Sequence, residues 1–189
     1  MRNFDQRMAR GKEFEDKTRD SLIHDGYFVI PLSAPTGREF EGPRAYTLGH
    51  SIPTPDFFCV HPTSGYQFFV ETKSWQNWQW YKATQTYRTG FKTNDMRNYN
   101  DIKTLTGIDL YVYIYHWDGT QSHRNLAMNC PDKVCPTGLD IIELSDLQHA
   151  ISLTKDNSHM YRGTEFRYAD RDFIHLEHEN RGPWNAHRH

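Results

Sequence analysis

The chain has 189 residues, a formal net charge of -2, and 37% hydrophobic and 14% aromatic residues. This length suits one domain with a short extension, and the aromatic content excludes an intrinsically disordered chain. No apolar run approaches the ~20 residues of a bilayer span, the N-terminus has no apolar leader stretch, and three cysteines do not make a secreted disulfide framework. We therefore expect a cytoplasmic protein with reduced thiols.

The first predicted element is a helix over residues 4–25 that is charged on most faces. Its apolar contacts would be Phe14, Leu22 and Ile23, and the Asp-Gly pair that follows would end it. A strand over residues 27–30 comes next.

Residues 33–55 are dense in Gly and Pro and predict a loop, with room for a short strand around Tyr46. Two β-rich runs then flank the turn-forming segment 62–65, which is the clearest hairpin signal in the chain. From Trp75 to Phe91, aromatic and polar residues mix without a clear period.

The second half of the chain continues the alternation of helices and strands. Three-residue apolar spacing predicts a helix over residues 95–106, and the next apolar run has apolar residues on both faces, as in a central strand. Later residues predict a loop over 120–138, then a short strand and a helix capped by Ser145. The last thirty residues predict only a small strand or helix and a tail.

This order of elements predicts an α/β or α+β fold with a mixed β-sheet flanked by helices. We assign residues 1–155 to one domain and 156–189 to a C-terminal extension. Charge is uneven along the chain, because residues 82–103 hold five Lys or Arg against two acids, whereas residues 140–189 hold nine acids against six. A nucleic-acid partner would meet the first of these regions or the basic N-terminus.

The hairpin brings two carboxylates together. A four-residue turn pairs His61 with Tyr66, and the same register places Asp56 opposite Glu71. Side-chain alternation then puts Lys73 on the face that carries both acids. Opposed carboxylates repel, so Lys73 and a hard divalent cation such as Mg²⁺ are expected to neutralise them. A metal ion of this kind activates water and stabilises a phosphoryl oxygen, which is the outline of a phosphodiesterase site.

Pro55-Asp56 and Glu71-Thr72-Lys73, in a hairpin behind an N-terminal helix, resemble the PD-(D/E)XK nuclease superfamily over residues 8–116. The resemblance implies a restriction-endonuclease-like fold and hydrolysis of DNA with Mg²⁺ or Mn²⁺. By this resemblance Asp56, Glu71 and the carbonyl of Thr72 bind the metal, and Lys73 assists catalysis.

Gly11 and Glu15 on the first helix are similar to the G-x-x-x-E pattern of the Holliday-junction resolvase branch. This implies that Glu15 is a further metal-binding or catalytic acid, with Gly11 on the same face one turn earlier. Enzymes of that branch act as symmetric dimers on branched DNA, so a homodimer is expected here too.

Alternatives stay open at this point. Asp56 can instead cap a turn, with Glu71 and Lys73 as a charge pair on an exposed edge strand, and Glu15 can be a surface partner of Arg19. A restriction- or phage-type DNA endonuclease and a catalytically silent nucleic-acid-binding module are the rival functions.

The segment after the E-x-K motif mixes aromatic rings with cations, which suits stacking on bases and contact with phosphates. The same rings can also be core residues. The candidate nucleic-acid contacts are Gly11, Trp75, Lys82, Gln85, Arg88, Lys92, Arg97 and Tyr99.

Two histidine-containing sets offer weaker metal sites. His116, His123, Cys130 and Cys135 could bind zinc, but they lack the tight C-x₂-C spacing of structural sites. The histidines of the C-terminal segment are expected to be surface residues.

Overall fold

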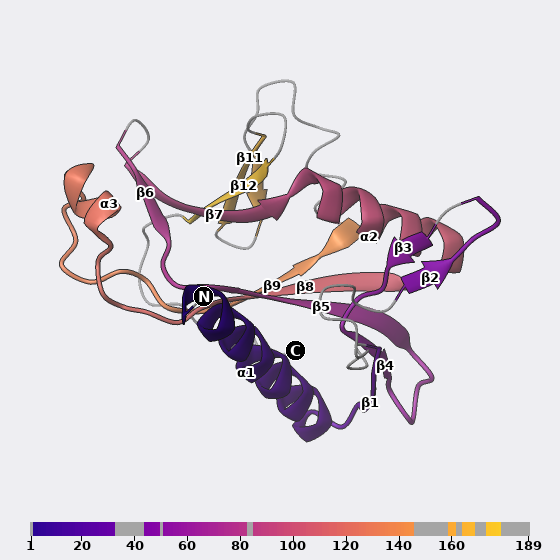
Figure 1. The fold of residues 1–189 in the computed structure, drawn as a ribbon. Coiled ribbons are helices and arrows are strands. Elements are labelled where there is room, and N and C mark those ends of the chain that lie inside the picture. The colour runs from indigo at the N-terminus through magenta and orange to yellow at the C-terminus, as the bar shows by residue number, and fades with distance from the viewer. Residues whose placement is uncertain are drawn as a thin grey trace. The chain divides into compact units, whose positions relative to one another are not determined.

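A computed structural model describes residues 2–32, 44–49, 51–82, 85–145, 159–161, 164–168 and 173–178 (Figure 1). Its first sheet has five strands in the order β1-β4-β5-β8-β9. These strands are β1 (Phe28–Pro31), β4 (Phe57–Val60), β5 (Gln67–Trp75), β8 (Asp109–His116) and β9 (Gly138–Glu143). This mixed sheet flanked by helices confirms the predicted α/β (α+β) fold class.

Contacts divide the chain into two compact units. The first unit comprises Met1–Lys73, Arg97–Tyr113 and Ile141–Leu144. The second comprises Ser74–Met96, Ile114–Asp140 and Ser145–His189. Both units therefore draw on the first 155 residues, and the described strands beyond residue 155 belong to the second unit.

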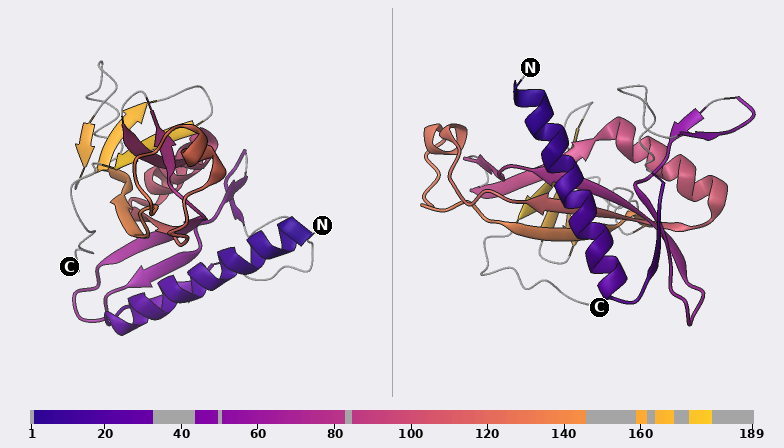
Figure 2. Two further views of the ribbon diagram at one scale, coloured as in Figure 1. Left: turned by 90° about the vertical axis from the view of Figure 1, so that its left-hand side faces the viewer. Right: turned by 60° about the horizontal axis from the view of Figure 1, so that its bottom comes forward.

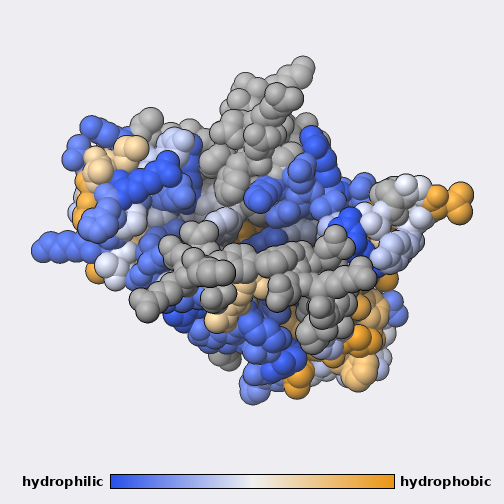
Figure 3. Space-filling view, viewed as in Figure 1, coloured by the Kyte–Doolittle hydropathy of each residue, from blue (hydrophilic) through white to orange (hydrophobic). Residues whose placement is uncertain are grey.

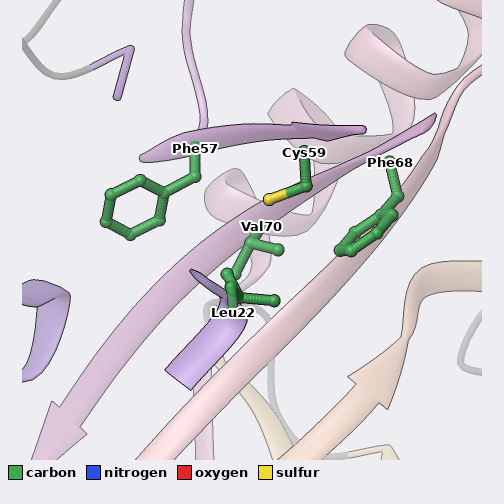
Figure 4. Packing of buried hydrophobic residues seen from close by; sticks show 5 residues of the cluster. All are labelled: Leu22, Phe57, Cys59, Phe68 and Val70. Atoms are coloured by element: carbon green, nitrogen blue, oxygen red, sulfur yellow. The ribbon is translucent and has the colours of Figure 1, made fainter. Parts of the chain in front are cut away.

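Helix α1 (Arg2–His24) packs on the first unit's sheet through Leu22, which is 2% exposed. Figure 4 shows this side chain beneath four residues of β4 and β5, namely Phe57, Cys59, Phe68 and Val70. The prediction that Ile23 joins the core is wrong, because its side chain is 53% exposed. Within the described residues no helix is both long and apolar enough to cross a membrane.

Helix α2 (Thr93–Thr106) lies on the opposite face of this sheet from α1 (Figures 1 and 2). Its predicted apolar stripe is buried at Met96, Tyr99 and Ile102. The helix ends at Gly107, whose N–H bonds to the carbonyl of Lys103 and whose φ of +69° favours glycine.

The hairpin of β4 and β5 has the predicted register. Phe57 pairs with Val70 and Phe58 with Phe69, and the rings of that second pair lie 5.3 Å apart. The turn closes through a 2.8 Å bond from the His61 N–H to the carbonyl of Tyr66. On β5, Phe68 and Val70 pack with Leu22 of α1, whereas Lys73 lies near Tyr99 of α2.

A short strand at Tyr46 is present as β2 (Arg44–Tyr46), and it pairs with β3 (Ser51–Pro53). Tyr46 and Leu48 are strongly exposed on this hairpin, and its hydrophobic tip stands out on the right of Figure 3. These two side chains therefore lie outside the core.

The second unit contains a five-stranded sheet in the order β10-β11-β12-β7-β6. Its strands are β6 (Gln79–Tyr81), β7 (Thr86–Lys92), β10 (His159–Tyr161), β11 (Thr164–Tyr168) and β12 (Phe173–His178). The segment with no clear period thus forms the hairpin of β6 and β7. Trp80 and Tyr87 pair across this hairpin and are buried. Strand β6 has only three residues, which are too few to show an alternation of buried and exposed side chains in the sequence.

Within the segment predicted as a loop, residues 123–127 form the short helix α3 (His123–Ala127), capped by the Ser122 hydroxyl. Its buried Asn125 accepts a hydrogen bond from the Trp80 N–H and donates one to the Trp78 carbonyl. Hydrogen bonds between distant segments leave no periodic pattern in the sequence. The prediction of a loop was therefore wrong for residues 123–127. The body of the helix expected after Ser145 lies outside the described residues.

Candidate active site

Asp56 and Glu71 lie within electrostatic range of each other, directly beyond the last observed pair of the β4–β5 hairpin. Continuing the observed register by one pair beyond Phe57 and Val70 places Asp56 opposite Glu71. The carboxylate of Asp56 accepts a 2.7 Å hydrogen bond from the Thr72 N–H, which ties the two segments together. The two acids predicted from the sequence are thus brought together.

Thr72 also connects this pair to helix α1. Its hydroxyl lies 3.3 Å from that of Thr18, which is fully buried. Thr18 was not singled out in the sequence, although it lies three residues after Glu15 and so shares its face of the helix. Its contact holds the strand that carries Glu71 against the helix that carries Glu15.

Lys73 lies on the same face as Glu71 and neutralises it in part. Its Nζ donates a 2.7 Å hydrogen bond to Glu71 Oε1, and the two side chains are only 24% and 12% exposed. The Tyr99 ring of α2 lies 5.7 Å from this Nζ, within the range of a cation–π contact. The ammonium group is therefore held by a strand and a helix together.

Glu15 completes a group of three carboxylates within electrostatic range of one another. Burial is the main cause that raises the pKa of Glu15, and the charge of Glu71 raises it further, against a lowering by Lys12. The Lys12 Nζ lies 3.7 Å away, whereas Arg19 pairs with Asp16 and Asp20 rather than with Glu15.

Asp56 has the most strongly shifted pKa of the site. Burial raises the pKa of Asp56 well above its ordinary value, and the carboxylates of Glu71 and Glu15 raise it further. The Thr72 N–H and Lys73 lower it but do not offset the burial. Burial together with the neighbouring carboxylates thus makes a negative charge on Asp56 costly, even with Lys73 nearby.

β5 lies between β4 and β8, so it is a central strand. The alternative of an exposed charge pair on an edge strand is therefore wrong for Glu71 and Lys73, which are both largely buried. A carboxylate on this central strand, beside the buried carboxyl group of Asp56, requires a specific neutralising partner.

The donor set has the chemistry of a hard-cation site. Among the described residues, no three His, Cys, Asp or Glu side chains form a ready-made metal-ligand group. Mg²⁺ is usually held by one or two carboxylates together with waters and substrate phosphates, so Asp56 and Glu71 could supply its protein ligands. Glu15 is the third acid that their electrostatics reach.

The candidate nucleic-acid contacts divide between the two units. Gly11, Arg97 and Tyr99 belong to the first unit, where Arg97 is exposed and Tyr99 is buried beneath Lys73. Because Tyr99 is buried, it can hold Lys73 in place but is not available as a nucleic-acid contact. The contacts that belong to the second unit are Trp75, Lys82, Gln85, Arg88 and Lys92.

In that second group, Trp75 is 38% exposed, and Lys82, Gln85 and Lys92 are exposed as well. Arg88 lies with its guanidinium carbon 3.7 Å from the centre of the Tyr81 ring. Gln85 lies in the turn between β6 and β7, at a φ of 53°.

The four possible zinc ligands do not gather into a metal-ligand group in the described part of the chain. His116 is instead stacked on Trp78 at 4.1 Å, and its Nε2 lies 2.8 Å from the Thr89 hydroxyl. Its Nδ1 lies 3.7 Å from the carboxyl group of Asp140. The cysteines are free thiols, and Cys59 and Cys135 are buried.

Comparisons of the chain with protein-family models, with curated proteins and with solved structures find no match. The functional argument therefore rests on the site itself. Chemically, the site combines three carboxylates, which can bind a hard cation, with an ammonium group that can hydrogen-bond a water or a phosphate oxygen.

Proposed function

We propose that the chain is a metal-dependent nuclease that hydrolyses DNA phosphodiester bonds at the carboxylate site of the first unit. The observation that carries the proposal is the buried carboxyl group of Asp56 within electrostatic range of Glu71 on the central strand β5, with Lys73 bonded to Glu71. Two neighbouring carboxylates repel each other unless a proton or a cation neutralises them. Burial, and then the charges of Glu71 and Glu15, raise the pKa of Asp56, and a bound cation would remove this cost.

Asp56, Glu71 and Glu15 would hold Mg²⁺ or Mn²⁺. Such an ion, when bound, lowers the pKa of a water and stabilises negative charge that develops on a phosphoryl oxygen. Lys73 Nζ, fixed by Glu71 and the Tyr99 ring, can hydrogen-bond the attacking water and hold it in line with the phosphate. Thr72 supports the reaction by fixing one oxygen of Asp56.

The substrate class follows from helix α1 in this proposal. Gly11 and Glu15 lie one turn apart, and a Cβ added at Gly11 would meet nothing within 4 Å, so the packing here does not require a glycine. The resemblance of this helix to the resolvase branch favours a structure-selective endonuclease. A symmetric dimer would place two sites on two strands of a branched DNA.

The test is a cleavage assay on a four-way junction, a linear duplex, a single strand and an RNA, with and without Mg²⁺ or Mn²⁺. We expect paired, metal-dependent nicks in the junction that are lost in Glu71→Gln. Glu143→Gln is the matched control, because this carboxylate of β9 is also half-buried but contacts Tyr111 rather than the site.

Each result of this assay has a defined meaning. Cleavage of linear duplex at fixed sequences would replace the resolvase-like reading with a restriction- or phage-type endonuclease. Absence of metal-dependent cleavage on all four substrates would overturn the nuclease proposal and favour a catalytically silent nucleic-acid-binding module.

A further inference from the structure

The hairpin of β6 and β7 in the second unit separates its aromatic side chains into two sets. Trp80 and Tyr87 pair across the strands, are buried and contact each other edge to face at 5.2 Å. Tyr81 and Arg88 alternate with them and therefore lie on the opposite face of the hairpin. The buried set is core, so only the other face is available to a ligand.

On that available face Tyr81 and Arg88 form a diagonal pair between the strands. The guanidinium carbon of Arg88 lies 3.7 Å from the centre of the Tyr81 ring, which is stacking distance. Tyr81 is 37% exposed, so part of this side chain faces solvent. An aromatic ring backed by a cation is a platform on which another flat group can stack.

Within the segment that carries this pair, the charged residues are of one sign. Residues 75–94 contain no Asp or Glu, and they contain Lys82, Arg88 and Lys92, in a chain whose net charge is -2. Lys82 and Lys92 are exposed. Strand β12 pairs with β7 and places Glu177 opposite Arg88 in the register. The segment of residues 75–94 itself thus offers only cations to a polyanion.

We infer that the outer face of the β6–β7 hairpin, formed by Tyr81, Arg88, Lys82 and Lys92, binds single-stranded nucleic acid. A base stacks on the open side of Tyr81, and the cations contact the phosphates on either side. A single strand fits better than a duplex because the bases of a duplex are already stacked on one another. An acidic peptide would use the cations but would not need the ring.

This inference goes beyond the proposed nuclease. The surface belongs to the second unit, whereas the carboxylates belong to the first. Binding here requires neither a metal ion nor cleavage, so the two proposals can fail separately.

The experiment measures fluorescence anisotropy of labelled oligo(dT) with the full chain in the presence of EDTA. We expect Tyr81→Ala to weaken binding about tenfold, the effect of losing one stacked base. Tyr81→Phe should bind like the wild type because it keeps the ring. Tyr46→Ala is the control, since it removes an exposed tyrosine of the other unit.

Charge is tested separately through the dependence of affinity on salt. Lys82→Ala should reduce the slope of log affinity against log salt by about 0.7, the value for one phosphate contact on a single strand. Because Lys82 is exposed, this variant also tests the inference if Tyr81→Ala fails to fold. Equal binding by the wild type and Tyr81→Ala, an unchanged salt slope in Lys82→Ala, or equal affinity for a duplex of the same length would overturn the inference.

Discussion

At the scale of single residues, Lys73 and Lys103 provide a matched comparison. Each donates a 2.7 Å bond to a carboxylate, and their side chains are 24% and 22% exposed. If Lys73 holds the attacking water, Lys73→Met should lower the cleavage rate by about 10²-fold or more. Lys103→Met should cleave at nearly the wild-type rate, as measured under single-turnover conditions.

Both variants should retain stabilisation by Mg²⁺, because neither removes a carboxylate. An equal loss of cleavage in the two lysine variants would assign the effect of Lys73 to general destabilisation rather than to chemistry.

Besides its proposed contact with the metal ion, Glu15 acts on Asp56 through charge. Its carboxylate raises the pKa of Asp56, so Glu15→Gln should lower that pKa and leave Asp56 ionised at lower pH. The pH at which Mg²⁺ stabilisation is half-developed should therefore decrease in this variant. Thermal melts across a pH series, with and without Mg²⁺, measure this midpoint.

Glu13→Gln is the control for that shift. Glu13 lies on the same helix, but its carboxylate is paired with Arg10 and Lys17. A midpoint that stays unchanged in Glu15→Gln, or that decreases equally in Glu13→Gln, would remove Glu15 from the site.

At the scale of elements, the position of Glu15 depends on how α1 packs. Leu22→Ala should destabilise the chain by about 2–5 kcal/mol, because it opens a cavity under β4 and β5. The neighbouring Ile23→Ala should change stability by no more than about 0.5 kcal/mol, because Ile23 is 53% exposed. Denaturant melts of both variants distinguish these cases, and similar losses in the two would contradict the packing.

The hairpin that carries the site could be predicted from the sequence for a physical reason. Residues 62–65 form a turn of fixed length, and in an antiparallel pair the turn sets every later pairing. This is why the register from His61 and Tyr66 extended correctly to Phe57 and Val70. The apolar stripe of α2 was predictable for the same kind of reason, since local spacing determines it.

Other elements depend on contacts that local patterns do not contain. Helix α3 has five residues and is held by the bonds of Asn125 to Trp78 and Trp80, which are far away in the sequence. The role of Thr18 likewise becomes visible only when α1 lies beside β5. The division between buried Trp80 and exposed Tyr81 required the register of the β6–β7 hairpin.

At the scale of the whole molecule, a buried acid of the second unit makes stability depend on pH. Burial raises the pKa of Asp140 to about 8. The folded chain therefore holds a proton that the unfolded chain loses near its ordinary value of 3.8. Stability from this group is fully present below that ordinary value and is lost as the pH rises through the folded value.

Asp140→Asn should therefore flatten the decline of the melting temperature between about pH 4 and about pH 8. Asp118→Asn is a control whose pKa shift has the opposite direction, because hydrogen bonds from Gln76 and Thr120 lower the pKa of Asp118. It should reduce stability throughout this range without changing the slope. An unchanged slope in Asp140→Asn would contradict the burial of Asp140 in solution.

The most direct test of the carboxylate site is the thermal stability of the wild type and Asp56→Asn at neutral pH as Mg²⁺ is added. The asparagine can still accept the Thr72 N–H, but it removes the repulsion with Glu71 and Glu15. The site we propose predicts that Asp56→Asn melts higher than the wild type without metal and does not respond to Mg²⁺, whereas the wild type gains stability as the ion binds. A wild type that does not respond to Mg²⁺, or an equal response in both proteins, would contradict a metal site at these carboxylates.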